Sequence, residues 1–137
     1  MNQIPVLRRC LTPEPLFSSQ SGHIYSLCSG RLRLLTQTPL QPGPDSPNFS
    51  RRQKYLRVQG KWHGNKYDYY VYRLMVVWLP ETTNLSPCAL RRYQVHHLNG
   101  VLANNEASNL ICLSPATHRR FDAALAQGLV LTRKSLC

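Results

Sequence analysis

The stretch that decides the fold runs from Tyr93 to Gly100 with the sequence YQVHHLNG, and it continues from Asn109 to Asp122. Its first half combines β-favouring tyrosine and valine with a terminal Asn-Gly dipeptide, which predicts a short strand ending in a turn. The apolar run Leu110–Leu113 predicts a second strand that pairs back against the first. The segment 100–108 is rich in asparagine and alanine, has no clear period, and is expected to be an ordered loop.

A helix is predicted directly after the second strand. Ser114 fits the N-cap position, Pro115 fits the first helical position, and the pattern extends through Ala126 until Gly128 ends it. The predicted order is therefore strand, loop, strand, helix.

Three of the five histidines of the chain lie in this unit. On the helix, His118 and Asp122 are four residues apart, which places both side chains on one face. His96 and His97 end the first strand, where successive side chains point to opposite sides, so only one of them can face the helix. This division suits two tasks, because one imidazole can bind a metal ion while its neighbour takes a proton from water. The pattern predicts a metal site for phosphodiester hydrolysis.

That reaction has three physical requirements: an activated water, stabilisation of the extra negative charge on the phosphorane, and help for the departing 3′ oxygen. One divalent ion supplies the last two. A histidine, with an ordinary pKa of about 6.5, supplies the first at neutral pH. No separate nucleophile is required.

The same residues resemble the HNH endonuclease family, whose ββα-metal core carries a histidine pair, a downstream asparagine, and a final histidine or asparagine on the helix. Asn109 follows His97 by twelve residues, and His118 follows Asn109 by nine. The resemblance implies that His97 is the general base and that His96 and His118 bind the catalytic metal ion. It also implies that Asn109 pins the loop by hydrogen bonds so that His97 is correctly aimed. Asp122, one turn after His118, is expected either to ligate the metal or to orient His118.

The ligand types widen the choice of metal ion. Many family members have aspartate at the position of His96, and many phage homing members have asparagine at the position of His118. Two imidazoles make a softer site than those oxygen ligands. One divalent ion is expected, with Mg²⁺ first and Mn²⁺, Zn²⁺ or Ni²⁺ as alternatives.

The charge of the chain predicts a polyanionic partner. The 137 residues contain 17 Lys plus Arg against six Asp plus Glu, a net charge of +11. Each phosphate that such a protein neutralises releases condensed counterions. Ribosomal and membrane-surface proteins are also strongly basic, so the net charge alone does not identify DNA as the partner. With the resemblance, double-stranded DNA is the expected partner.

Cysteine usage and hydropathy predict the compartment. The five cysteines are scattered without a Cys-x-x-Cys pair, so no structural zinc cluster is expected and the thiols should be reduced. The chain lacks an apolar run of about 18 residues, which a membrane span would need, and it begins without a secretory pattern. We expect a soluble cytoplasmic protein that does not bind membranes and is a monomer or weak dimer.

The fold class expected is α+β, with a small N-terminal β-rich module followed by a ββα-metal nuclease core. Prolines and a basic pair in the first segment suggest a mobile arm, and a longer cluster of prolines suggests a surface loop. The expected boundaries are a flexible basic arm at 1–19, a β-rich DNA-contacting module at 20–80 with a Pro-rich loop at 38–50 and a helix near 73–79, the nuclease core at 88–128, and a C-terminal tail at 129–137.

Within the β-rich module, one pattern predicts an amphipathic strand and another predicts a hairpin. The alternating segment Arg31–Leu35 follows Ser29-Gly30 and places two arginines on one face and two leucines on the other. Two strand-like runs at 55–59 and 67–72, the second rich in tyrosine, flank a basic tip at 60–66 and predict the hairpin. The arginines expected to contact DNA phosphates are Arg31, Arg33, Arg51, Arg52, Arg91, Arg92, Arg119 and Arg120.

Two classes of function therefore remain. The first is a metal-dependent DNA endonuclease of HNH type, similar to phage homing or free-standing mobile enzymes. The second is a non-catalytic nucleic-acid-binding protein that keeps the nuclease scaffold, and a degradative nuclease without site preference is a further alternative. The intact set of His97, Asn109 and His118 favours the first.

Overall fold

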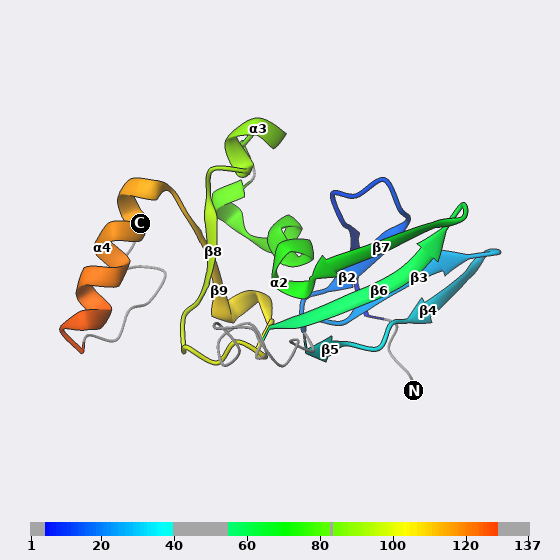
Figure 1. The fold of residues 1–137 in the computed structure, drawn as a ribbon, viewed down its shortest axis with the longest axis horizontal. Coiled ribbons are helices and arrows are strands. Elements are labelled where there is room, and N and C mark those ends of the chain that lie inside the picture. The colour runs from blue at the N-terminus through cyan, green and yellow to red at the C-terminus, as the bar shows by residue number, and fades with distance from the viewer. Residues whose placement is uncertain (1–4, 40–54, 83, 129–137) are drawn as a thin grey trace, which may run out of the picture.

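The computed structural model describes residues 5–39, 55–82 and 84–128, apart from the side chains of Pro87, Phe121, Asp122 and Leu125. These residues form an α+β fold with three antiparallel sheets (Figure 1). None of the helices in these ranges is long and apolar enough to cross a membrane.

The N-terminal sheet has the strand order β1-β2-β3-β4, formed by β1 (Leu7–Arg9), β2 (Leu16–Ser19), β3 (Ile24–Cys28) and β4 (Arg31–Leu34). The prediction of a flexible arm at 1–19 is therefore wrong for the described residues of that segment. The prolines suggested an arm, but they fall at position 5 and in the turn between β1 and β2. Cys10 and Leu16 on either side of this turn are buried, and the Cys10 amide donates to the Leu16 carbonyl at 2.8 Å.

The β3–β4 hairpin turns at Ser29-Gly30, where both residues have positive φ (52° and 75°), as a tight two-residue turn requires. The predicted alternation of arginine and leucine is present in β4, but its leucine face is not buried. Leu32 and Leu34 are 50% and 55% exposed. β4 is also the edge strand of its sheet.

A second sheet contains β5 (Thr38–Pro39), β6 (Leu56–Trp62) and β7 (Asn65–Tyr70). The predicted hairpin with a basic tip is thus confirmed, and it turns at His63-Gly64 with positive φ at both residues. The expected loop at 38–50 is corrected at its start, because Thr38 and Pro39 pair with β6. Its remainder lies outside the described residues.

Short helical segments connect this sheet to the last unit. Where the sequence predicts a helix near 73–79, the chain forms α2 (Val71–Leu74) and then the 3₁₀ turn η1 (Met75–Trp78). The connector contains η2 (Pro80–Thr82) and α3 (Pro87–Leu90). Residues 71, 74, 75 and 76 are buried, so this segment packs against the core.

The final unit has the predicted order of strand, loop, strand and helix. β8 (Gln94–His97) pairs antiparallel with β9 (Leu110–Leu113) after the turn η3 (Ala107–Asn109), and α4 (Pro115–Ala126) follows. The Ser114 hydroxyl accepts a hydrogen bond from the Thr117 amide at 3.3 Å, which confirms the expected N-cap.

The β8–β9 hairpin lies between two layers, with α4 on one side and α2 on the other (Figure 1). Leu110 and Cys112 join the main core with Val58 and Val71, whereas Ile111 and Leu113 form a smaller cluster with Leu98. All four residues of β9 are buried. The main core is shared by the N-terminal sheets and the final unit, so the two halves pack as one structure.

A second contact joins the halves at the β2–β3 turn. The Ala107 amide donates to the Gln20 carbonyl at 2.9 Å. Gly22 has φ of +94°, and a Cβ at this position would lie 2.9 Å from the Asn105 carbonyl oxygen. A glycine is needed here both for its backbone conformation and for the close approach of the loop that precedes β9.

This contact gives a stability prediction. Gly22→Ala should lower the free energy of unfolding by about 1–3 kcal/mol, from the strained backbone and the displaced loop. Gly30→Ala is the matched control, because Gly30 also has positive φ but no heavy atom lies within 4 Å of the place that its Cβ would occupy. Urea unfolding of both variants measures the difference, and an equal loss would contradict a role for the Gly22–Asn105 contact.

Candidate functional site

His96 and His118 face each other across the interface between β8 and α4. Their ring centroids are 4.5 Å apart and the ring planes are tilted by 31°. His96 reaches α4 because it shares the face of β8 that carries Gln94, and His118 lies in the first turn of the helix. The structure therefore brings together these two predicted metal ligands.

His97 leaves β8 on the opposite side, as the alternation of a strand requires. Its ring lies 6.0 Å from that of Tyr55 and 5.8 Å from that of Tyr72, between centroids. His97 is 7% exposed, and its Nε2 is 2.8 Å from Oδ1 of Asn105. The predicted general base therefore sits among tyrosines of the N-terminal half and does not face α4.

The electrostatic environment keeps His97 neutral. Burial lowers its pKa from the ordinary value of 6.5, and the hydrogen bond with Asn105 offsets part of that shift. Burial acts in this direction because it disfavours the charged imidazolium. At neutral pH the ring therefore has one nitrogen able to accept a proton.

Which nitrogen is free depends on the amide of Asn105. When Oδ1 faces the ring, Nε2 carries the hydrogen and donates it, so Nδ1 holds the lone pair. In this orientation the Asn105 Nδ2 is a buried donor without a partner among the described residues. Rotating the amide would pair Nδ2 with Nε2 and move the ring hydrogen to Nδ1. General-base chemistry at Nδ1 requires the first orientation.

Asn109 closes the loop between β8 and β9. Its Oδ1 accepts a hydrogen bond from the Asn99 amide at 3.0 Å, and its Nδ2 donates to the Asn104 carbonyl at 2.9 Å. Asn109 is 8% exposed, so its side chain is largely shielded from water. The hydrogen bonds that the resemblance implies for this residue are present, and they fix the loop that also carries Asn105.

Sequence reasoning did not single out Asn105 or the two tyrosines that contact His97. Asn105 stands in a polar loop without periodicity, and nothing local distinguishes it from Asn104. Tyr72 precedes His97 by 25 residues and Tyr55 precedes it by 42, and no spacing rule connects them to it. The fold alone brings these rings together, because β6 and α2 pack against the face of β8 that carries His97.

A divalent metal ion fits the His96–His118 pair. Two neutral imidazoles are nitrogen donors suited to such an ion, and they leave coordination positions open for water or a phosphate oxygen, as catalytic sites require. The side chain of Asp122, the third predicted ligand, lies outside the described residues. Among the side chains that are described, no three of His, Cys, Asp or Glu gather in one place.

The predicted DNA-binding arginines fall into two separate groups. Arg91 and Arg92 precede β8, and Arg119 and Arg120 lie on α4, all four exposed. The exposed Arg31 and Arg33 are on β4, at the opposite end of the molecule from α4 (Figure 1). Arg51 and Arg52 lie outside the described residues. Contact of any of these side chains with DNA stays a prediction.

Comparison with known proteins supports the fold. No protein-family model matches the sequence, and no curated protein matches it. Among solved structures, the chain is similar to one described as "DNA binding and cleavage by the HNH homing endonuclease I-HmuI", with a TM-score of 0.59 and 17% sequence identity. Over the matched residues, the chain shares the fold of that solved structure. The match covers 95% of this chain and 63% of that protein.

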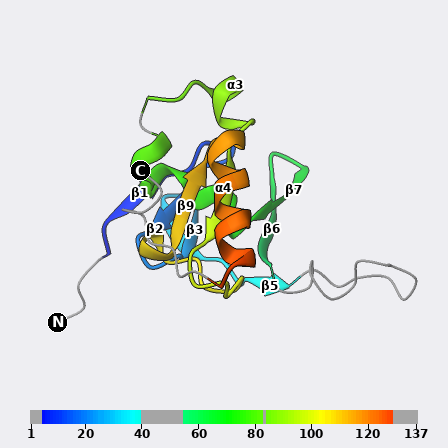
Figure 2. The same cartoon turned by 90° about the vertical axis from the view of Figure 1, so that its left-hand side faces the viewer.

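The shared fold agrees with the predicted α+β class, and β8, β9 and α4 have the expected order of strand, loop, strand and helix. Figure 2 shows α4 beside β9. At 17% identity the similarity concerns the fold, so the roles of individual residues rest on their own geometry.

The loop held by Asn109 gives a second stability prediction. Asn109→Ala should lower the free energy of unfolding by about 1–3 kcal/mol, because it leaves the Asn99 amide and the Asn104 carbonyl without their partners. Asn99→Ala is the control from the same loop, since the Asn99 side chain is exposed and makes one local bond with the Val101 amide. Chemical unfolding compares them, and an equal or larger loss from Asn99→Ala would contradict the assignment.

Proposed function

We propose that this protein is a metal-dependent DNA endonuclease of the HNH type that hydrolyses phosphodiester bonds. The observation that carries the proposal is the placement of three histidines around one strand end. His96 meets His118 on one side of β8, and His97 is held in a defined orientation on the other side. The HNH fold and the net charge of +11 support the same conclusion.

The role of His97 is that of general base. Its neutral ring accepts a proton from the attacking water at Nδ1, while Asn105 holds Nε2 and so fixes the ring. His96 and His97 leave β8 on opposite sides, so a phosphate that both groups serve must lie beside the end of the strand. His97 is the last residue of β8.

The metal ligands are His96 and His118, with Asp122 either as a further ligand or as a group that orients His118. A divalent ion at this pair stabilises charge on the phosphorane and on the leaving 3′ oxygen. Mg²⁺ is the first expectation, and two imidazoles also suit Mn²⁺, Zn²⁺ or Ni²⁺. Asn109 acts through the loop, by holding it against β9.

The substrate proposed is double-stranded DNA, and the enzyme is of the phage-type homing or free-standing mobile kind. We propose that it acts in the cytoplasm as a monomer or weak dimer. We propose that the exposed arginines beside β8 and on α4 bind phosphates that flank the cut.

One observation favours a different function. His97 is 7% exposed and packs against two tyrosine rings, as a purely structural histidine would. A non-catalytic nucleic-acid-binding protein on the same scaffold would keep this packing.

A degradative nuclease without site preference is a further alternative. It would give a smear of products from plasmid DNA, whereas a homing enzyme gives discrete fragments.

The first test concerns the general base. His97→Ala should reduce cleavage of plasmid DNA by about 10²-fold to 10⁴-fold, since a positioned general base contributes that much to the rate. DNA binding, measured without divalent metal, should be largely retained. His23→Ala, a change of an exposed histidine in the β2–β3 turn, should leave both unchanged. Equal loss of binding and cleavage in His97→Ala would contradict the proposal, because it would mean that His97 has a structural role in packing.

The second test concerns the metal. His96→Ala and His118→Ala should each weaken Mn²⁺ binding measured by calorimetry, and chelator should stop cleavage by the unaltered protein. His118→Asn should preserve cleavage with Mg²⁺ while weakening Zn²⁺ binding, because it replaces a nitrogen ligand with an oxygen ligand. Unchanged Mn²⁺ binding in both alanine variants would place the metal elsewhere.

A further inference from the structure

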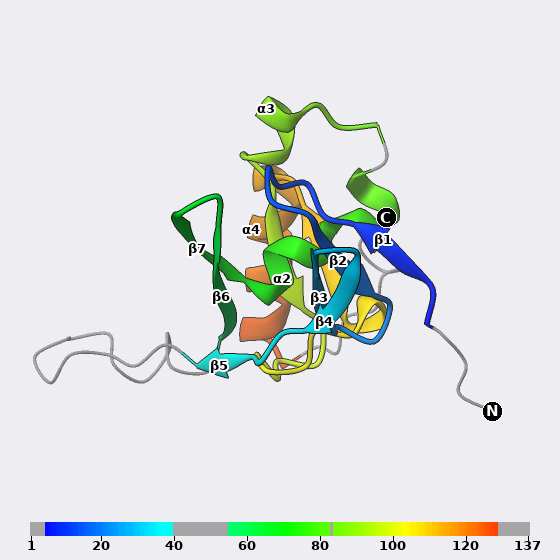
Figure 3. The same cartoon turned by 90° about the vertical axis from the view of Figure 1, so that its right-hand side faces the viewer.

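The four-stranded sheet has an open edge at β4, far from the candidate site. β4 is the last strand in the order β1-β2-β3-β4, and no further strand of the described residues pairs with it. It lies at the end of the molecule away from α4, and Figure 3 views the molecule from that end. An edge strand presents backbone N–H and C=O groups with which a strand of another chain can pair.

The register of β4 shows which backbone groups are open. The Leu35 amide donates to the Ile24 carbonyl at 2.9 Å, in line with the pairing of β3 and β4. Along an antiparallel strand, residues bonded to the neighbour alternate with residues whose backbone groups point away from it. Counting back by two from Leu35, Arg33 is bonded to β3. Leu32 and Leu34 therefore direct their N–H and C=O groups to the open edge.

The same two leucines belong to an exposed apolar face. Strand pairing places Leu27 opposite Leu32 and Tyr25 opposite Leu34, so these four side chains share one face of the sheet. Leu27, Leu32 and Leu34 are 39%, 50% and 55% exposed. Exposed apolar side chains that lie together mark a site of contact with another apolar surface. A phosphate backbone offers no such surface.

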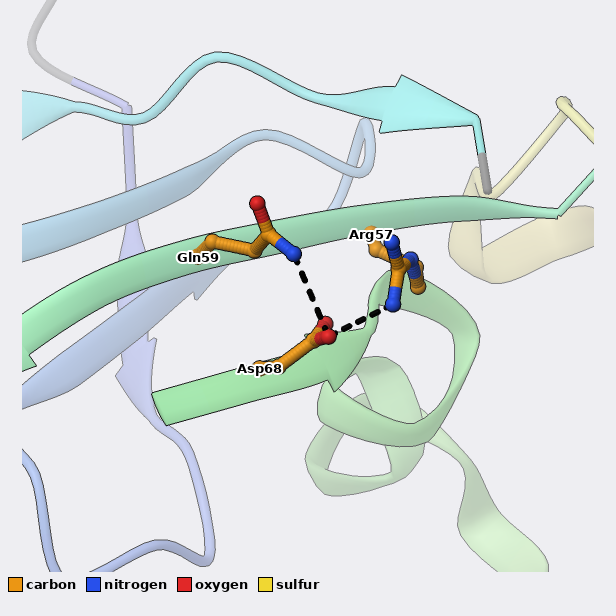
Figure 4. Close-up of polar contacts among 3 residues, drawn as sticks. All are labelled: Arg57, Gln59 and Asp68. Carbon is orange, nitrogen blue, oxygen red and sulfur yellow. Dashed lines mark hydrogen bonds and ion pairs between the residues drawn. The ribbon is translucent and has the colours of Figure 1, made fainter. Parts of the chain in front are cut away.

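The other face of β4 carries positive charge without a compensating acid. Arg31 and Arg33 alternate with the leucines, and both are exposed. The ion pair found among the described residues joins Arg57 to Asp68 in the β6–β7 hairpin, where Gln59 donates to the same carboxylate (Figure 4). In the described part of the chain, the two β4 arginines therefore have no carboxylate partner. We call the strand Arg31–Leu34, with its outward backbone groups, the β4 edge.

The alternation of charge along the β4 edge disfavours a second copy of the chain and favours an acidic partner. Two antiparallel copies of β4 that matched their leucines on one face would bring the arginines of both copies together on the other. Like charges opposite each other destabilise a pair of strands. A strand with acidic residues opposite the arginines and apolar residues opposite the leucines removes this repulsion and covers the apolar face.

We propose that the β4 edge binds an extended segment of a partner protein in which acidic and apolar residues alternate. The segment adds to the sheet beside β4, with its backbone bonded to Leu32 and Leu34 and its carboxylates paired with Arg31 and Arg33. In such strand addition, main-chain hydrogen bonds supply affinity and the side chains select the partner. The interaction is independent of the proposed endonuclease function. It assigns to a protein partner two arginines that the sequence predicts to contact DNA.

The pattern is tested with synthetic peptides and the full chain. The probe is a fluorescein-labelled peptide of alternating glutamate and valine, with binding measured by fluorescence anisotropy. Its control has the same composition, with the glutamates and valines in separate blocks, so it carries the same charge but cannot match β4. The alternating peptide should bind at least about tenfold more tightly, the effect of one or two net hydrogen bonds. Equal binding of the two peptides would mean that net charge alone attracts them, and the proposal would fail.

Charge reversal tests the two arginines. The double variant Arg31→Glu, Arg33→Glu should lose the glutamate–valine peptide and bind an alternating lysine–valine peptide instead. The matched control is Arg119→Glu, Arg120→Glu, which makes the same change of net charge at exposed positions of α4 and should keep the original preference. Equal loss of the glutamate–valine peptide in both variants would contradict the assignment. Circular dichroism confirms that each variant retains its fold.

Hydrogen exchange locates the added strand. Bound glutamate–valine peptide should slow exchange of the Leu32 and Leu34 amides, because these point to the open edge. Exchange of the Arg33 amide should change less, since it is already bonded to β3. Nuclear magnetic resonance measures all three amides in the free and bound protein. Binding that leaves Leu32 and Leu34 unprotected would overturn strand addition.

Two other occupants of the β4 edge are separated by the same protein samples. If the alternating peptide does not bind and Arg31→Glu, Arg33→Glu loses affinity for a DNA duplex in chelator, the arginines belong to a DNA interface and the proposal is wrong. Sedimentation of the unaltered protein tests for a second copy. A dimer that Leu32→Glu abolishes would assign the β4 edge to self-association and would also overturn the proposal.

Discussion

The alternation of side chains along β8 is the constraint on which the site depends. The strand is covered on both sides, with α4 on one face and the N-terminal half on the other. Val95 and His97 therefore point toward the tyrosines and the main core, whereas His96 points to His118. A slip of one residue in the pairing with β9 would exchange the two histidines. Burial of all four β9 residues keeps that register fixed.

The N-terminal half is part of this arrangement because it completes the core under the hairpin. Leu110 and Cys112 are buried in a cluster to which β6 and α2 contribute. The close approach of Gly22 to Asn105 fixes the loop that carries the hydrogen-bond partner of His97. The position of the candidate base is thus determined by contacts from distant parts of the chain. Burial of the His97 ring also lowers its pKa. The ring is therefore favoured in its neutral form, which can accept a proton.

The sequence by itself determined the local unit at the end of the chain and pointed to the residues of its candidate site. The Asn-Gly turn, the apolar run of β9 and the Ser-Pro helix start act over a few residues, so their patterns predict strand, loop, strand and helix correctly. The alternation rule also predicted that His96 and His97 would face different partners. The exposure of the β4 leucines was beyond that rule, because it depends on which segments pack against that face of the sheet.

Only the tertiary structure decided what surrounds His97. The paired strands β1 and β2, which local composition suggested would be a mobile arm, are held by burial of Cys10 and Leu16 in a core built from the whole chain. Asn105, Tyr55 and Tyr72 contact His97 through such long-range packing, which no periodic pattern in the sequence predicts. Local patterns specify backbone conformation, but the environment of a buried side chain is set by segments far away in the sequence.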